Sequence, residues 1–125
     1  MTELTNNGLV LLLGLFIIKH FLADYPLQVA KHYTNKGTYG HWGGVEHALI
    51  HGVLTAAVLY AFAPILVVAK MAAIDTVIHY HVDWAKMNLN KRMGYGPTTH
   101  EQFWWLLGLD QMLHYLTYLA IIYYL

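Results

Sequence analysis

The sequence predicts an all-α, polytopic membrane protein, a bundle of four transmembrane helices with a cluster of histidines and aspartates in its cytoplasmic half. Three observations lead to this prediction. The 125-residue chain is 58% hydrophobic and 11% charged, whereas soluble domains average roughly 25% charged residues. Short polar segments separate four long apolar ones. Each apolar segment contains a pair of His or Asp residues four positions apart, which places both on one face of a helix.

Composition excludes several classes of function. Net charge is zero when histidine is neutral, so no nucleic-acid partner is expected. The absence of cysteine excludes a thiolate zinc site, a disulfide framework and a cysteine nucleophile. The first apolar run lacks a basic segment before it and a small-residue cleavage site after it, so we expect a retained helix rather than a cleaved signal peptide. The length predicts a single domain over residues 1–125.

The predicted spans cover residues 5–24, 45–62, 65–87 and 99–124. The first reaches roughly 20 residues, enough for a hydrocarbon core of about 30 Å. Pro26 should end or kink it, and Pro64 leaves almost no linker between the second and third spans, which therefore form a tight helical hairpin. The polar stretch 28–44 is interpreted as a loop with room for a short interfacial helix.

Basic residues predict the orientation of the bundle. They gather in the loops between spans one and two and between spans three and four, namely at Lys31, Lys36, Lys86, Lys91 and Arg92. By the positive-inside rule these loops face the cytoplasm and both termini face outward, as expected for a protein of the inner (cytoplasmic) membrane. Lys19, near the cytoplasmic end of the first span, could snorkel to the interface.

The paired residues are the main functional signal. Thirteen His and Asp residues placed at random in this chain would give about 1.3 pairs at a separation of four. The chain contains five: His20/Asp24, His47/His51, Asp75/His79, His79/Asp83 and Asp110/His114. At least one pair from each span falls in the cytoplasmic half. We therefore predict that they meet in one buried cluster.

A metal would explain why carboxylates are buried there. An aspartate near the bilayer centre costs roughly 2.5–3.5 kcal/mol, unless it is paired, hydrated or bound to a cation. Imidazole and carboxylate are ligands for zinc, iron or manganese, and we expect zinc, as one or two ions. The predicted ligands are His20, Asp24, His47, His51, His79, Asp83, Asp110 and His114. The open alternative is a metal-free hydrogen-bond network or proton path.

The remaining polar residues receive separate interpretations. Asp75 is equally compatible with a metal ligand, a proton relay and a partner for Lys70. Glu46 is interpreted as an interfacial carboxylate near Lys36, with a general base as the alternative. His81 should point away from the cluster. The histidines expected to be solvated, in loops or at interfaces, are His32, His41 and His100.

The motifs also carry a resemblance. The runs are His20-Phe-Leu-Ala-Asp24-Tyr-Pro-Leu-Gln28, His47-Ala-Leu-Ile-His51, His79-Tyr-His-Val-Asp83-Trp-Ala-Lys86 and Asp110-Gln111-Met-Leu-His114. In type and order they resemble a family of small bacterial and phage membrane proteins, domain of unknown function 3307. The resemblance implies that Gln28, Lys36, Lys86 and Gln111 belong to the site as substrate-binding residues. It supplies no activity. More loosely, the motifs are similar to those of membrane-bound metal-dependent hydrolases.

A metal-dependent hydrolase is the function these features favour. A shallow site with lysines at its mouth suits a lipid or lipid-phosphate ester in the cytoplasmic leaflet of the bilayer. A bound metal would lower the pKa of water to about 7 and polarise the phosphoryl or acyl oxygen. Asp24 or Asp83 would act as the catalytic base. Lys36 and Lys86 would bind the anionic headgroup, unless they are only topology signals.

Two other functions stay open. Histidine-rich helices also serve di-iron oxidases that act on lipids, although aspartates make up nearly half of this set. Chains of intramembrane His and Asp residues also mark metal-ion or proton transporters and channels. A transporter would need polar residues across the outer half, where few occur, mainly Thr55, Asp75 and Thr117. Four short helices would also have to assemble into a homo-oligomer to give room for alternating access.

Overall fold

The computed structural model describes residues 4–125, and this part of the chain is all-α, as predicted. It contains no strand between residues 4 and 125. The five helices are α1 (Asn6–Asp24), α2 (Ala30–Asn35), α3 (Trp42–Leu59), α4 (Ile65–Met93) and α5 (Glu101–Tyr123). The short α2 occupies the polar stretch in which an interfacial helix was expected. The other four helices correspond to the four predicted spans.

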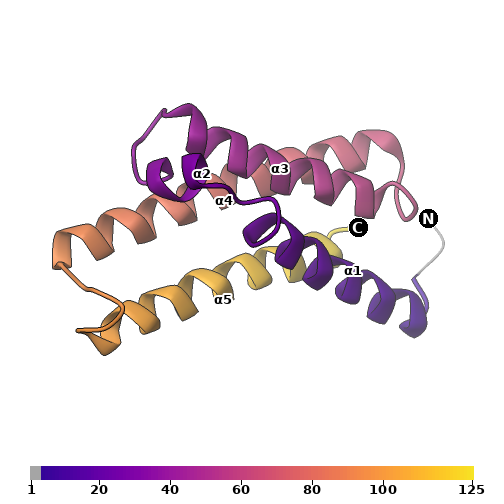
Figure 1. Cartoon of the computed structure of the whole chain (residues 1–125). Helices are drawn as coiled ribbons and strands as arrows, with labels where there is room; N and C mark the ends of the chain where they lie inside the picture. Colours follow the sequence, from indigo (N-terminus) through magenta and orange to yellow (C-terminus); the bar gives the residue numbers. More distant parts are fainter. Residues whose placement is uncertain (1–3) are drawn as a thin grey trace.

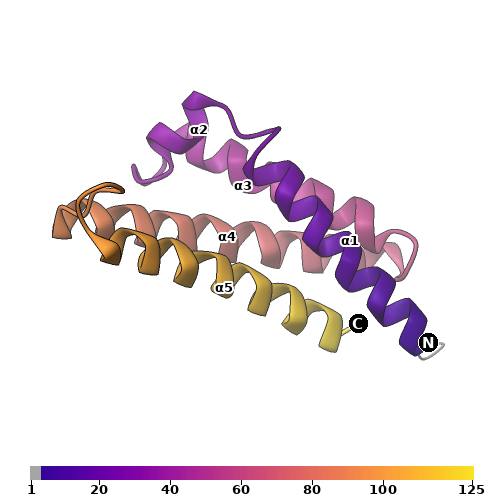
Figure 2. The ribbon, with the colours of Figure 1, turned by 60° about the horizontal axis from the view of Figure 1, so that its bottom comes forward.

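The four long helices form a bundle in which each packs against two of the others, in the order α1, α3, α4, α5 and back to α1 (Figure 1). α3 and α4 form an antiparallel hairpin, and α5 runs back along α4. α1 packs against α3 and α5, and α2 packs against α3. In Figure 2 the paired α4 and α5 extend beyond α1 and α3 at the end opposite the N-terminus. The bundle therefore has one end made by the α3–α4 turn and another made by α2 and the α4–α5 turn.

Local signals explain where the helices begin and end. The hydroxyl of Thr5 accepts a hydrogen bond from the backbone N–H of Gly8 at 3.2 Å and caps α1. Pro64 precedes the first residue of α4, where its missing N–H costs nothing. Gly94 ends α4 with a left-handed φ of 69°. α4 thus continues six residues beyond the predicted end of the third span at residue 87, because polar side chains alone do not stop a helix.

Two glycines of α3 allow close helix packing. A side chain at Gly43 would overlap the carbonyl of Lys31 and lie 3.1 Å from the Cβ of Asn35, so glycine lets α2 rest on α3. A side chain at Gly52 would overlap Thr76 and lie 3.1 Å from the carbonyl oxygen of Ala72. Small residues at such points bring membrane helices into contact. The histidines of α3 are thereby held close to those of α4.

The interior of the bundle is polar at one end and apolar at the other. The apolar end contains Leu12, Phe16, Leu59, Val68, Met71, Tyr118 and Ile121. The polar end contains the buried histidines and aspartates. On the outside, large apolar side chains are exposed, such as Leu66 at 82% and Val53 at 66%. The polarity is thus reversed from that of a water-soluble bundle, whose charged groups are rarely buried.

Two of the helices, α1 and α4, are long and apolar enough to cross a membrane, judged by length and composition alone. The prediction of four spans is therefore not supported by this criterion. α3 and α5 are of similar length to α1 but do not meet this criterion.

The contact at Gly52 generates a stability prediction. Gly52→Ala should lower the stability of the protein by about 1–3 kcal/mol, because the added methyl group overpacks the α3–α4 contact. Gly14→Ala is the matched control, since no atom lies within 4 Å of a methyl group added there. Thermal unfolding in detergent should show a lower Tm for Gly52→Ala only. Equal melting temperatures for the two variants would contradict the packing argument.

Candidate metal centre

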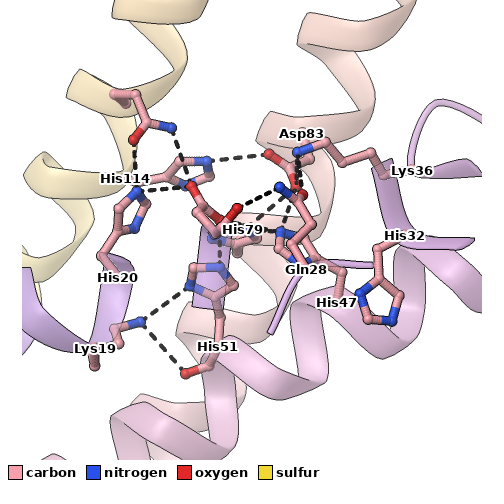
Figure 3. Close-up of polar contacts among 12 residues, drawn as sticks. Lys19, His20, Gln28, His32, Lys36, His47, His51, His79, Asp83 and His114 are labelled. Carbon is pink, nitrogen blue, oxygen red and sulfur yellow. Dashed lines mark hydrogen bonds and ion pairs between the residues drawn. The ribbon is translucent and has the colours of Figure 1, made fainter. Parts of the chain in front are cut away.

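Two overlapping groups of His and Asp side chains meet inside the polar end of the bundle (Figure 3). The first comprises Asp24, His47, His51 and His79, and the second comprises His79, Asp83 and His114. In each group one potential ligand atom per residue lies within 4.8 Å of all the others. The histidines and Asp83 are buried, and Asp24 is half-buried. The groups draw residues from α1, α3, α4 and α5, as the paired spacing predicted.

The carboxylate of Asp24 connects α1 to two histidines of α3. Its Oδ1 lies 2.8 Å from Nε2 of His51 and 3.3 Å from Nε2 of His47. Nε2 of His47 in turn lies 3.3 Å from Nε2 of His79 on α4. These atoms therefore converge on one point from three helices.

The carboxylate of Asp83 makes the matching connection from α4. Its Oδ2 lies 3.2 Å from Nζ of Lys36, 3.3 Å from Nε2 of His79 and 3.4 Å from Nε2 of His47. Its Oδ1 lies 3.3 Å from Nε2 of His114 on α5. Asp83 thus touches α3, α5 and the segment after α2.

The spacing of these atoms suits a bound metal ion. Ligand bonds of 2.0–2.1 Å in tetrahedral geometry place ligand atoms roughly 3.3–3.4 Å apart. The separations within the set that joins His47, His79 and Asp83 are 3.3–3.4 Å. In addition, Oδ1 of Asp110 is buried without a hydrogen-bond partner among the described residues, which is unusual for a carboxylate oxygen. The buried groups could therefore hold a metal ion.

Stacking fixes the planes of three of the imidazole rings. The ring centroids of His51 and His79 are 3.6 Å apart, and those of His79 and His114 are 3.9 Å apart. The interplanar angles are 24° and 17°. α3, α4 and α5 each supply one ring of this stack, so the ring orientations depend on the packing of all three helices.

His20 lies beside the two groups and has partners for both ring nitrogens. Nε2 is 3.0 Å from Oδ2 of Asp24 and 2.8 Å from Oε1 of Gln111, and Nδ1 is 2.7 Å from the hydroxyl of Tyr118. Because both neighbours of Nε2 are acceptors, Nε2–H donates to them. In the neutral ring the Tyr118 hydroxyl then donates to Nδ1. In this arrangement His20 orients Asp24.

Asp110 lies at the edge of the cluster, and its side chain is buried. Its Oδ1 is 3.5 Å from Nε2 of His114, and its Oδ2 accepts a hydrogen bond from Nε2 of Gln111 at 3.1 Å. Gln111 also donates to Oδ2 of Asp24 at 3.3 Å. The structure thus brings all eight predicted ligands together, with His20 and Asp110 outside the two convergent groups.

A cavity of about 380 Å³ opens onto the cluster. Asp24 and Asp110 line it, together with all four residues that the family resemblance implied, Gln28, Lys36, Lys86 and Gln111. Nζ of Lys36 donates to Oε1 of Gln28 at 3.3 Å, and Nε2 of Gln28 donates to the backbone carbonyl of Asp24 at 2.6 Å.

The charge on Lys36 is stabilised by the cluster. Burial lowers the pKa of this lysine, but the carboxylates of Asp83, Asp24 and Asp110 outweigh burial, so the pKa lies above its ordinary value. The lining of the cavity therefore carries a firmly held positive charge.

Comparison with known proteins agrees with the motif resemblance. The model of the family described as protein of unknown function (DUF3307) matches residues 12–125. The chain belongs to this family. All the cluster residues lie within the matched DUF3307 region. No curated protein and no solved structure matches the chain.

Lys19 also belongs to the polar interior of this DUF3307 chain, which the sequence did not predict. Its side chain is 3% exposed, so the prediction that it snorkels was wrong. Its Nζ lies 2.9 Å from Oδ2 of Asp75 and 3.5 Å from Nδ1 of His51. Asp75 is thus paired with Lys19 rather than with Lys70, which is exposed. The hydroxyl of Thr55 donates to the same Asp75 oxygen at 2.5 Å.

His32 is a second correction. It was predicted to be solvated, but it is 3% exposed and its Nε2 lies 3.3 Å from Oε2 of Glu46. Glu46 also pairs with Lys31, and not with Lys36 as expected. The prediction for the other solvated histidines is confirmed, since His41 and His100 are exposed. His81 is likewise exposed and outside the cluster, as predicted.

The signals for the missed partners are partly visible in the sequence. Thr55 follows His51 by four residues, and Tyr118 follows His114 by four. Both therefore extend the paired faces by one turn. Lys19 and His32 have no such signal, because their burial depends on contacts between helices.

The buried pair of Lys19 and Asp75 generates a second prediction. Lys19→Met should destabilise the protein by about 3–5 kcal/mol, because it leaves the Asp75 carboxylate buried and unpaired. The double variant Lys19→Met/Asp75→Leu should recover much of this loss. Thermal unfolding in detergent is measured for both single variants and for the double variant. The three results give the coupling free energy between Lys19 and Asp75. Strictly additive effects would show that the pair does not act as a unit.

Proposed function

We propose that this protein is a membrane-embedded, metal-dependent hydrolase acting on a lipid or lipid-phosphate ester at the cytoplasmic leaflet. The observation that supports it most is the convergence of two His/Asp groups beside a cavity that is lined by two lysines. Metal-binding donors, a general-base carboxylate and an anion-attracting rim are the parts that such a hydrolase requires.

The proposal includes four transmembrane helices. The outward faces of α3 and α5 are apolar even though their inward faces are polar, with Val53, Leu116 and Leu119 among the exposed side chains. Trp104 and Trp105, both exposed near the start of α5, suit a membrane interface. A helix of this kind can span a bilayer when its polar stripe faces the bundle. With Lys91 and Arg92 on the cytoplasmic side of the inner membrane, both termini face outward.

In this proposal His47, His51, His79 and His114, together with Asp24 and Asp83, hold one or two divalent ions, zinc first and iron or manganese as alternatives. A bound divalent ion would polarise the ester oxygen and activate water. Asp24 or Asp83 would accept the proton from water. Hydrogen bonds from His20 and Gln111 would hold the Asp24 carboxylate in position. Lys36 and Lys86 would attract the anionic part of the substrate.

The apolar end of the bundle favours a hydrolase over a transporter. Beyond Asp75 the interior is filled by side chains such as Leu12, Leu59 and Val68. Asp75 itself is paired with Lys19 and hydrogen-bonded by Thr55. An ion or proton path needs polar groups along its whole length, whereas this polar region ends inside the bundle.

Metal content tests the first part of the proposal. Purified protein should contain one or two equivalents of a divalent metal by elemental analysis, and His51→Ala should lose at least half of it. His81→Ala is the matched control and should keep the metal, because His81 is exposed outside the cluster. Chelation should also lower the Tm, since a bound metal stabilises the folded state. Purified protein that contains no divalent metal, and whose Tm does not change on chelation, would contradict the proposal.

Hydrolysis tests the second part. Phosphatidic acid in mixed micelles should release either inorganic phosphate or fatty acid, and chelation should abolish the release until zinc is restored. Asp83→Asn should reduce turnover by about two to four orders of magnitude, as expected for loss of a general base. His100→Ala, at an exposed histidine outside the cluster, should retain turnover. A metal-loaded protein that releases neither product would argue against a lipid-phosphate ester as the substrate.

A further inference from the structure

An apolar groove runs along the outer side of the contact between α4 and α5. One part, of about 480 Å³, is lined by side chains such as Val77, Val82, Leu106 and Leu109. A second part, of about 620 Å³, continues toward the apolar end of the bundle. Ile78 and Leu113 line both parts, so the two form one continuous groove.

The groove is continuous with the site cavity. Lys86 and Asp110 line the groove and also the cavity that opens onto the cluster. Two other apolar hollows, one between α1 and α5 around Ile17 and one between α3 and α4 around Ala48, share no lining residue with that cavity. The groove between α4 and α5 thus differs from these hollows by leading to the candidate metal centre.

We propose that this groove holds one acyl chain of an anionic phospholipid whose phosphate lies in the site cavity beside Lys36 and Lys86. The proposal rests on the proposed function and specifies its substrate class and binding mode. The lipid enters sideways from the bilayer between α4 and α5. Its ester or phosphoester then lies next to Asp110, at the edge of the cluster.

Length and polarity both favour this occupant. The first part of the groove follows α4 from Lys86 back to Val77, or roughly 14 Å at 1.5 Å per residue, and the second part continues to Lys70. Half of a hydrocarbon core of about 30 Å is of similar depth to the first part, so an acyl chain of one leaflet fits within the groove. The lining of the first part is apolar except for His81 and for Lys86 and Asp110, which stand where the groove meets the cavity, and Lys70 lines the second part. An amphiphile with a negative headgroup matches that order.

Lys86 is the residue that would make the groove prefer an anionic lipid to a lipid without net charge. Lys36 is already paired with Asp83. Within residues 4–125, Lys86 forms no ion pair, and its ammonium donates a weak hydrogen bond to Sδ of Met87 at 3.9 Å. Its ammonium group can therefore pair with a phosphate at the junction of groove and cavity.

Photo-crosslinking tests the proposal. The full chain in nanodiscs is incubated with phosphatidic acid that carries a diazirine in one acyl chain, and the labelled peptides are mapped by mass spectrometry. Labelling should concentrate on α4 and α5 residues of the groove. Ala85→Trp, which fills the groove, should reduce it at least fivefold. Ala57→Trp is the matched control, since Ala57 is an exposed alanine of α3, and it should label as the wild type does.

The headgroup is tested with a second probe. The same diazirine chain on phosphatidylcholine should label the groove several-fold less than phosphatidic acid does, and Lys86→Gln should remove that preference. Labelling spread evenly over α1, α3 and α5, or equal labelling of the two tryptophan variants, would overturn the proposal. An unlabelled groove would also overturn the proposal if a second copy of the chain covers it. In that case the protein would form dimers that Ala85→Trp dissociates.

The outcome is separable from that of the proposed function. His51→Ala disturbs the candidate metal centre but not the groove, so it should label like the wild type. Localised labelling in protein that contains no metal would reject the hydrolase and retain the lipid site. Metal-loaded protein with dispersed labelling would reject the lipid site alone.

Discussion

The bundle depends on the burial of two carboxylates among imidazoles. Asp24, at the end of α1, touches histidines of α3 and a glutamine of α5. Asp83, on α4, touches a histidine of α3 and one of α5. Each carboxylate therefore joins three of the four long helices. Removing a carboxylate from water costs several kcal/mol, so these helices are stable together only while the histidines and lysines surround it.

On each long helix, the row of buried side chains that faces the bundle interior is apolar at one end and polar at the other. On α5 the buried residues run from Ile121 and Tyr118 to His114 and Asp110. On α3 they run from Leu59 through Thr55 to His51. Residues four apart remain on one face, so a single stripe can close one end of the bundle and build a site at the other. Tyr118 stands at the boundary, stacked on Phe16 while its hydroxyl meets His20.

The helices and the paired ligands could be predicted because helical periodicity is local. A spacing of four places His47 and His51 on one face whatever surrounds them, and similar depths in four spans bring the pairs together. The burial of Lys19 and His32 could not be predicted in this way. Lys19 is buried because it reaches across to Asp75 on another helix. His32 is buried because Gly43 lets α2 rest on α3. The end of α4 lies beyond the predicted span for a different reason, since a left-handed glycine and not polarity determines it.

Charge balance connects the cluster, the cavity and the groove. Three carboxylates, Asp24, Asp83 and Asp110, lie together around the cluster, and Lys36 is the lysine paired with them. With neutral histidines this leaves two negative charges in a buried site, which one divalent cation would balance. Lys19 does not alter the sum, because Asp75 already neutralises it. Once that cation is present, the ammonium of Lys86, at the junction of cavity and groove, still has no ion-pair partner among the described residues. An anionic headgroup would therefore complete the balance, with its acyl chain in the groove.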